Sequence, residues 1–416
     1  MEKKEIKWAA HIPLIGGFGV AGLQEFETAP IFVSSYSAFA GNDGLFHNYM
    51  ENTKGLKYDK FLLDVEDIPE KYCNGYIDIM LGVPPCAGLS MCAAIKQDQR
   101  DCAAVNDWML NSAQYILEKV KPKVYCFENA PGLSSNLGVK VREKIENIAS
   151  TFEYSVVYYK TNTSKHGIPQ KRSRTYCFLV NTKTAPILEF KDKEMCEYVK
   201  YLDLVPKDAT LQDVFYCNDI YADTFEPVQY VKELYGDKWR ESLLEGRDSV
   251  SLYNVLLERN KLEDLLAWCE AKEDCDPAVI KNIKFILFKK SKGLGYRLGY
   301  KVVKLDRYAA GTMYSESLQR TLHPKYDRRL NAREIMHLMG MPHDFQILDY
   351  KKDVVKITQN CPVNTNRAMI EECIAIIKNE RPFYTEKVLF INNEKGEIIQ
   401  FNQDKKSKKA KTIALI

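Results

Sequence analysis

The stretch 79–90, IMLGVPPCAGLS, decides the fold class of this 416-residue chain. Its apolar start is typical of a buried strand, and the Pro-Pro pair ends that strand and fixes the turn. Residues 107–120 (DWMLNSAQYILEKV) have the apolar spacing of an amphipathic helix, which Pro122 stops, and residues 124–128 (VYCFE) are strand-like again. A strand, a helix and a second strand in this order predict a βαβ unit in a mostly parallel sheet.

The same alternation extends outward from this unit. The β-rich runs are residues 29–34, 77–82, 124–128, 154–159 and 175–180. Residues 364–378 predict a further helix, and residues 388–402 predict a hairpin. From about residue 190 to residue 345 the alternation is lost, which indicates a second domain or a large insertion. In α/β sheets of this kind, substrates bind in the loops at the carboxyl ends of the strands.

The net charge of +3 conceals a strong segregation of charge. Residues 191–280 hold 11 basic and 21 acidic side chains, and residues 289–333 hold 12 basic and 3 acidic ones. The basic part interleaves Gly, Tyr and Lys or Arg. It is either a solvated loop face or a surface that follows nucleic-acid phosphates. The basic run at residues 404–411 predicts a disordered tail.

Composition excludes several classes of protein. Hydrophobic residues make up 45% and aromatic residues 11%, which excludes a disordered or collagen-like chain. No apolar run approaches the roughly 20 residues of a membrane span, and no signal-type stretch follows Met1. The twelve cysteines lack the CxxC pairs of a zinc site. We therefore expect a cytoplasmic enzyme without a membrane or metal partner.

Three kinds of side chain that could take part in catalysis lie at adjacent strand ends. Cys86 follows a buried strand and enters a Gly-containing loop, where a thiol serves as a nucleophile, although a lone cysteine is more often core filling. Glu128 ends the next strand, as either a structural cap or a catalytic group. Residues 166–174 (HGIPQKRSR) place Arg172 and Arg174 on one face of an extended segment, where they are either solvated or functional.

The motifs PPC, ENAPG and QKRSR, in that order, resemble the DNA (cytosine-5)-methyltransferase family. Residues 328–345 (RRLNAREIMHLMGMPHDF) resemble the arginine-rich block of that family. Residues 359–363 (QNCPV) resemble its final cofactor-side motif, and residues 15–22 (IGGFGVAG) resemble its glycine-rich cofactor loop.

The resemblance implies an α/β fold, with a Rossmann-like, mostly parallel sheet, helices on both faces, and a smaller mixed target-recognition domain. The expected regions are a catalytic domain at 1–187, a recognition domain at 188–345, a return segment at 346–380, and a C-terminal hairpin with a basic tail at 381–416.

The implied reaction is transfer of a methyl group from S-adenosylmethionine to carbon 5 of a flipped-out cytosine in a specific double-stranded DNA sequence. Cys86 matches the nucleophile that adds to carbon 6. Glu128 matches the group near N3, where it needs a shared proton in a closed site. Arg174 matches the residue that holds O2, and Arg172 matches its bracing partner. Residues 89–106 match the loop that closes over the base.

The cofactor end departs from the family pattern. Ala10, Ile12 and Leu14 replace an acidic residue, a phenylalanine and the first glycine, and Ser35 stands where a carboxylate should hold the ribose hydroxyls. Asp64 matches the family's acid near the adenine amino group, and Asp67 is the neighbouring alternative. The cofactor-binding positions implied by the resemblance are Ile15, Gly16, Gly17, Phe18, Ser35, Tyr36, Asp64, Pro84 and Asn360. The expected DNA-binding positions are Ser90, Arg297, Lys301, Lys304, Arg307 and Arg333.

Two other functions stay open from the sequence. One is a catalytically silent homologue that binds DNA. The other is a cytosine-modifying enzyme with an RNA substrate or an altered one-carbon donor. For the methyltransferase we expect a nucleoid-associated monomer that binds double-stranded DNA. A restriction-modification role with a cognate restriction enzyme, an orphan role and a phage role are equally compatible with the sequence.

Overall fold

The computed structural model divides the chain into two compact units. We name the first the sheet unit (Met1–Met195, Met339–Leu348 and Asn360–Ile416) and the second the helical unit (Cys196–Leu338 and Asp349–Gln359). The residues that the structure describes are 5–36, 43–62, 64–90, 105–205, 226–293, 301–305, 321–328, 330–349, 353, 356–400 and 411–414.

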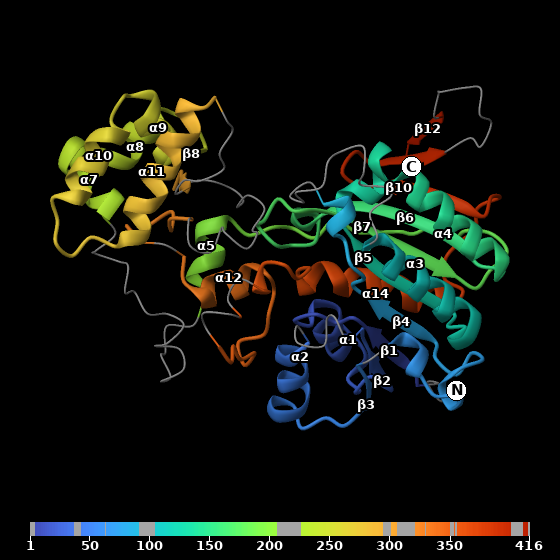
Figure 1. The fold of residues 1–416 in the computed structure, drawn as a ribbon. Coiled ribbons are helices and arrows are strands. Elements are labelled where there is room, and N and C mark those ends of the chain that lie inside the picture. Colours follow the sequence, from blue (N-terminus) through green and yellow to red (C-terminus); the bar gives the residue numbers. More distant parts are fainter. Residues whose placement is uncertain are drawn as a thin grey trace. The chain divides into compact units, whose positions relative to one another are not determined.

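A large sheet forms the centre of the sheet unit (Figure 1). Its strands are β1 (Trp8–His11), β2 (Phe32–Ser34), β3 (Asp59–Phe61), β4 (Ile79–Gly82), β5 (Val124–Asn129), β6 (Ser155–Asn162), β7 (Ser173–Val180), β10 (Val388–Asn392), β11 (Glu397–Gln400) and β12 (Lys411–Ala414). They lie in the order β12-β11-β10-β6-β7-β5-β4-β1-β2-β3. The strands from β3 to β5 are all parallel, whereas β7 runs antiparallel to both β5 and β6. Strand β10 then joins β6 in parallel.

Helices cover both faces of this sheet. On one face, α3 (Val105–Tyr115) and α4 (Val139–Thr151) pack against each other and the strands. Met109, Ala113 and Ile116 recur at helical spacing and are buried against Tyr125 and other strand residues in one core cluster. On the other face lie α1 (Gly17–Phe26) and α14 (Val363–Ile377), which contact each other along much of their lengths. The predicted α/β class with helices on both faces is thereby confirmed.

Several elements match the sequence predictions, and others were not predicted. The predicted strands correspond to β2, β4, β5, β6 and β7, and the predicted hairpin corresponds to β10 and β11. The predicted helix at 107–120 is α3 followed by one π-helical turn, Ile116–Val120, and it ends at Lys121, which has a left-handed backbone. Strands β1, β3 and β12 were missed. The predicted tail lies mostly outside the described residues, but its last residue begins β12, which pairs with β11.

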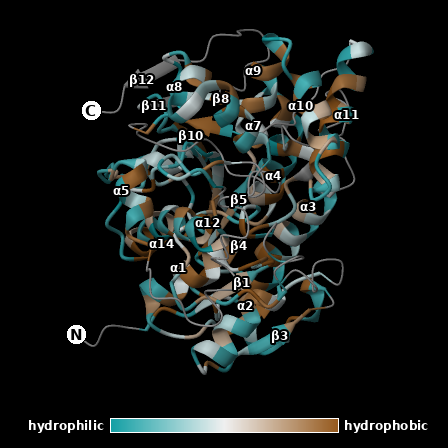
Figure 2. Ribbon diagram, turned by 90° about the vertical axis from the view of Figure 1, so that its left-hand side faces the viewer, coloured by the Kyte–Doolittle hydropathy of each residue, from teal (hydrophilic) through white to brown (hydrophobic). Residues whose placement is uncertain are grey.

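The helical unit has its own apolar core. Its elements are α5 (Tyr198–Asp203), α7 (Glu226–Tyr235), α8 (Trp239–Leu244), β8 (Ser249–Ser251), α9 (Leu252–Glu258), α10 (Leu262–Glu270), α11 (Pro277–Ser291), β9 (Lys301–Val303) and α12 (Ala332–Leu338). Trp239, Leu265 and Ile283 belong to one buried cluster, and β8 pairs antiparallel with β9. Figure 2 shows both apolar and polar turns along α11, which buries Ile283 yet leaves Phe288 55% exposed. Among the described helices, none is long and apolar enough to cross a membrane.

Candidate active site

Three strand ends meet at one edge of the central sheet. Cys86 lies beyond the carboxyl end of β4, next to the carboxyl end of β5, where Glu128 lies. Because β7 is antiparallel to β5, its first residues lie beside the last residues of β5, with Glu128 opposite Tyr176. Arg174 is two residues before Tyr176, and so it shares the sheet face of Glu128.

A buried ion pair joins two of these strands. The Arg174 Nε lies 2.5 Å from Glu128 Oε1, and the two side chains are 17% and 4% exposed. Arg174 also donates a hydrogen bond of 2.8 Å to the Ser173 carbonyl. Low exposure keeps solvent from screening this pair, so the two side chains fix each other's orientation.

Arg172 is buried beside this pair. Its guanidinium donates a hydrogen bond of 2.8 Å to the Asn360 carbonyl, which lies in the segment before α14. Burial, together with the charge of Arg174, lowers the pKa of Arg172 to about 10, so the side chain stays cationic at neutral pH. Arg172 therefore holds the β7 segment against the chain that returns from the helical unit.

The Cys86 thiol lies within electrostatic reach of all three groups. Burial raises the pKa of Cys86, the carboxylate of Glu128 raises it further, and the two arginines, Arg174 and Arg172, act in the opposite direction. The resting thiol is therefore protonated at neutral pH. The structure thus brings together all four of the predicted catalytic residues, although their roles stay predictions.

Close backbone packing fixes the turn that carries Cys86. The Leu89 N–H donates to the Cys86 carbonyl at 3.0 Å, within the 3₁₀ turn Ala87–Leu89. A Cβ atom on Gly132 would lie 2.1 Å from the Leu89 carbonyl oxygen. Only glycine therefore lets the loop after β5 approach the cysteine turn so closely.

Replacing Glu128 with Gln is expected to lower the pKa of Cys86. The change removes the negative charge that raises this pKa and leaves the positive charge of Arg174 uncompensated. Alkylation of Cys86 by iodoacetamide, followed by peptide mapping across pH, should then become fast at a lower pH than in the wild type. Cys73, which is also half-buried, provides the internal control. An unchanged or raised pH midpoint for Cys86 would contradict the electrostatic arrangement.

The predicted cofactor loop packs against the segment before α14. The Gly17 N–H donates to Asn360 Oδ1 at 2.9 Å, and a Cβ atom on Gly17 would lie 2.3 Å from the Cys361 carbonyl oxygen. Ile15 and Phe18 are buried, as are Gly16 and Pro84. The Phe18 ring meets the Tyr176 ring edge-on at 5.8 Å. Residues 15–18 and Asn360, far apart in the sequence, are thus neighbours.

A second group of predicted cofactor residues lies near the end of β2. Tyr36 stacks on Trp108 with ring centroids 6.3 Å apart, and its hydroxyl accepts a hydrogen bond of 2.9 Å from Ser112. Burial and the nearby Asp64 carboxylate both raise the pKa of Tyr36. Asp64 and Asp67 form a reciprocal cap: the Asp67 carboxylate accepts the Asp64 N–H at 3.0 Å, and Asp64 Oδ1 accepts the Val65 N–H at 2.7 Å, so both side chains take part in a local turn.

The loop after β1 holds two residues in an unusual backbone conformation. Ile12 and Leu14 have φ angles of 47° and 52°, a left-handed conformation that costs free energy in residues other than glycine. The surrounding structure therefore holds this loop in a strained conformation next to the predicted cofactor residues.

Near these strand ends the sequence analysis named Ser35 but missed two other polar residues, His11 and Asp43. His11, Ser35 and Asp43 are fully buried, and each has side-chain atoms without a hydrogen-bond partner in the described chain: His11 Nε2, Ser35 Oγ and both carboxylate oxygens of Asp43. Burial lowers the pKa of His11 to about 3, so this imidazole is neutral. Orphaned polar atoms at the carboxyl ends of β1 and β2 indicate a polar ligand there.

Two further contacts brace the arginine strand. The Tyr176 hydroxyl donates to Asn366 Oδ1 at 2.8 Å and lies 2.6 Å from Cys361 Sγ, which ties β7 to α14. At the other side, the Ser173 hydroxyl, between the two arginines, donates to Glu394 in the turn of the C-terminal hairpin. Glu394 also forms an ion pair of 2.9 Å with Lys160. No local pattern could have indicated these contacts.

The predicted DNA-binding residues are only partly described. Arg297 and Arg307 lie outside the described residues, as does most of the predicted closing loop, 91–104. Ser90 is half-buried after the cysteine turn. Lys301 and Lys304, at β9, and Arg333, in α12, are half-buried in the helical unit.

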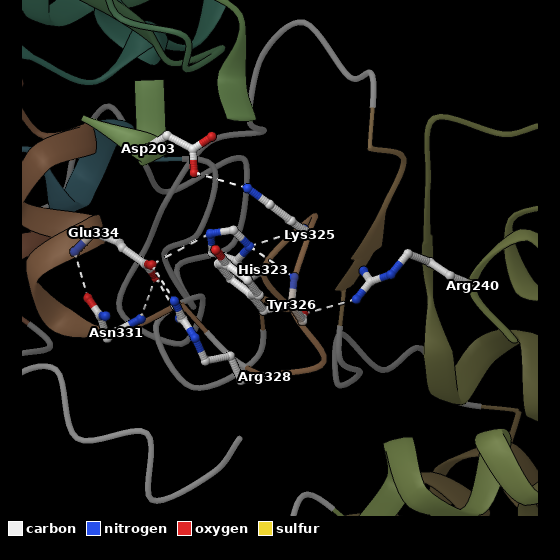
Figure 3. A network of polar contacts seen from close by, with 8 residues as sticks. All are labelled: Asp203, Arg240, His323, Lys325, Tyr326, Arg328, Asn331 and Glu334. Atoms are coloured by element: carbon white, nitrogen blue, oxygen red, sulfur yellow. Dashed lines mark hydrogen bonds and ion pairs between the residues drawn. The ribbon is translucent and has the colours of Figure 1, made fainter. Parts of the chain in front are cut away.

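Arg328, Asn331 and Glu334 of the arginine-rich segment form a polar network with His323 (Figure 3). Both nitrogens of the Arg328 guanidinium fork donate to Glu334, at 2.9 and 2.7 Å. Asn331 and Glu334 form a reciprocal cap, in which each side chain accepts the other's N–H, at the start of α12. Burial, together with Arg328, lowers the pKa of His323 to about 3, and its Nδ1 accepts the Lys325 N–H at 3.0 Å. Because Arg328 and Glu334 are paired, the network stabilises the helix start.

Across the described residues, no group of His, Cys, Asp or Glu side chains is arranged to hold a metal ion.

Parts of this chain are similar in sequence to known methyltransferases. Type II methyltransferase M1.HphI of Haemophilus parahaemolyticus is 23% identical over 185 residues, which cover 44% of this chain and 46% of that protein. Type II methyltransferase M.AgeI of Thalassovita gelatinovora is 29% identical over 104 residues, 25% of this chain and 23% of that protein. The chain thus spans less than half the length of these curated relatives.

Solved structures share the fold at low identity. The Entamoeba histolytica methyltransferase EhMeth superposes with a TM-score of 0.55 at 12% identity, covering 90% of this chain and 99% of that one. The S. pombe Dnmt2 methyltransferase gives 0.51 at 12% identity, with the same coverage of 90% and 99%. The model of the C-5 cytosine-specific DNA methylase family matches residues 15–375. Since this match takes in most of the chain, including every catalytic candidate, the protein belongs to the C-5 cytosine-specific DNA methylase family.

Proposed function

We propose that the protein methylates carbon 5 of a flipped-out cytosine in a specific double-stranded DNA sequence, acting as a monomer through a covalent adduct between Cys86 and carbon 6. One observation carries this proposal: Cys86, Glu128, Arg174 and Arg172 converge at one edge of the sheet. Family membership supports cytosine methylation in general, and the arrangement of these side chains supports the covalent route.

Cys86 supplies the nucleophile. Carbon 5 of cytosine is a weak nucleophile, and addition of a thiolate to carbon 6 converts the ring into an enamine that is a stronger one. The thiol must lose its proton first, and its raised pKa opposes this step in the free protein. The positive charges of Arg174 and Arg172 stabilise the thiolate when the base excludes water from the site.

Glu128 and Arg174 act on the ring of the base. When the Cys86 sulfur bonds to carbon 6, the electron pair of the C5–C6 double bond and the ring charge shift toward N3 and O2. A proton shared with Glu128 at N3 and a hydrogen bond from Arg174 to O2 lower the energy of this charge distribution. Because the ion pair already aligns both side chains, little reorganisation accompanies the addition. After carbon 5 has received the methyl group from the donor, a base removes the proton from carbon 5. The electron pair of that C–H bond re-forms the C5–C6 double bond and expels the Cys86 sulfur as a thiolate, which releases the methylated base.

The residues near β1 and β2 suit S-adenosylmethionine, which supplies an electrophilic methyl group when bound. The orphaned atoms of His11, Ser35 and Asp43 provide polar partners for a nucleoside. Asp64 and Tyr36 lie at the same end of the sheet, and the Gly17 loop permits close approach of a ligand to the backbone. We propose that these residues, with Ile15, Phe18 and Asn360, hold the donor.

A transfer assay tests the proposed function. The protein is incubated with methyl-labelled S-adenosylmethionine and mixed-sequence double-stranded DNA, with RNA in a parallel reaction, and the expected result is acid-stable label on DNA cytosine. Label on RNA alone would replace the DNA substrate by an RNA one. Absence of label and of a covalent complex on 5-fluorocytosine DNA, with DNA binding retained, would refute the enzymatic function.

Replacing Lys301 and Lys304 together with Ala is expected to weaken binding to all DNA sequences alike. These residues lie within the basic segment 289–333, and removing two lysine–phosphate ion pairs should reduce the slope of log K against log salt by about 2. Fluorescence anisotropy from about 50 to 200 mM salt measures this slope. Lys238→Ala, an exposed lysine in the acidic segment, is the matched control. An unchanged slope in the double variant would show that the lysines at β9 do not contact DNA.

A further inference from the structure

The carboxylate of Asp43 is the most unusual polar group of the sheet unit. Asp43 stands at the start of the short helix α2 (Gly44–Asn48) and is 0% exposed. Neither of its oxygens has a hydrogen-bond partner at normal distance and angle, and no other carboxylate in the described part of the chain leaves a buried oxygen in this state. A buried carboxylate without partners is destabilising, so this position is explained better by a ligand than by the fold.

The neighbours of Asp43 place it beyond the carboxyl ends of β1 and β2. Burial raises the pKa of Asp43 to about 7, and hydrogen bonding toward it from the Ser35 hydroxyl, after β2, and from the Leu14 backbone, after β1, acts in the opposite direction. Ser35 Oγ is itself buried and orphaned. Orphaned groups from two segments therefore gather beyond the carboxyl ends of β1 and β2, where ligands bind in α/β sheets.

The strand order indicates which part of a donor would reach Asp43. Cys86 lies beyond β4, and β1 separates β4 from β2. The reactive end of a donor must lie toward Cys86, so the part next to β2 is farther from the reacting carbon. In an adenosyl group this distant part includes the ribose, whose two hydroxyls are donors that match the two oxygens of one carboxylate.

We propose that Asp43 accepts hydrogen bonds from both ribose hydroxyls of the adenosyl group and so supplies the carboxylate that the Ser35 position lacks. This inference rests on the proposed function, because it takes an adenosyl compound as the ligand. It adds a binding residue from α2 in place of one at the end of β2. Satisfied by two hydroxyl donors, the buried carboxylate would no longer be unpartnered.

Calorimetric titration tests the assignment without DNA or turnover. S-adenosylhomocysteine and its 2′-deoxy analogue are titrated into the wild type and into Asp43→Asn, with Asp43→Ala as a second variant. The wild type should prefer the ribose compound by about 5- to 150-fold, and Asp43→Asn should bind both compounds with the same, weaker affinity. Asp107→Asn, an exposed carboxylate at the start of α3, should keep the wild-type preference.

Thermal unfolding without ligand distinguishes a binding residue from a structural one. At pH 8, Asp43→Asn should unfold at the same temperature as the wild type or higher, because the change removes a buried charge that has no partner. A variant that keeps the wild-type preference for ribose, or that only loses thermal stability, would overturn the assignment of Asp43 alone. Failure of the wild type to bind either compound would overturn the proposed donor as well.

Discussion

Replacing Cys86 with Ser is expected to abolish methyl transfer, with a loss of about 10⁴-fold or more, the scale on which removal of a nucleophile acts. A serine hydroxyl at this position is not ionised at neutral pH and does not add to carbon 6 of cytosine. Transfer of labelled methyl groups to DNA measures the loss. The wild type should also form a complex with 5-fluorocytosine DNA that survives denaturation, and the variant should form none.

Affinity for DNA separates this effect from misfolding. Cys86→Ser should bind DNA about as tightly as the wild type, because serine differs from cysteine by one atom at a half-buried position. Cys73→Ser, at a second half-buried cysteine that lies before β4, should remain fully active. Full activity of Cys86→Ser would show that the nucleophile has been assigned wrongly.

Replacing Arg174 with Ala is expected to damage both stability and activity. Glu128, 4% exposed, would lose its ion-pair partner, so the free energy of unfolding should fall by about 3–5 kcal/mol. The rate of transfer should fall by roughly 10²- to 10³-fold, since the variant lacks the donor for O2. Urea unfolding and single-turnover transfer measure the two effects.

Two comparisons identify the buried pair as the cause. Arg367→Ala breaks an ion pair of similar length, 2.5 Å to Glu25, but this arginine is 41% exposed, so the cost should stay below about 1 kcal/mol. Adding Glu128→Gln to Arg174→Ala should restore much of the lost stability, because the unpaired charge is then removed. It should not restore transfer. Equal losses for Arg174→Ala and Arg367→Ala would mean that burial of the pair contributes nothing.

Local patterns were sufficient for most of the sheet. Continuous apolar runs predicted β4 and β5, and helical spacing predicted α3, because each of these elements buries apolar residues that its own short segment specifies. Strands β1 and β3 are short and contain charged or small residues, so only their parallel pairing within the sheet makes them strands. In the helical unit, the many charged residues between positions 191 and 280 masked the apolar spacing, so the helices were not predicted. Their apolar faces are buried against one another.

The sequence by itself determined the candidate catalytic groups, because a thiol, a carboxylate and two guanidinium groups at strand ends are properties of short segments. Only the tertiary structure decided how they meet. The antiparallel insertion of β7 beside β5 brings Arg174 to Glu128, and the return of the chain brings Asn360 to Gly17 across 343 positions. The unpartnered state of Asp43 is equally a tertiary property. Such contacts depend on which strands become neighbours, and since pairing is set by packing of the whole unit, no local spacing records it.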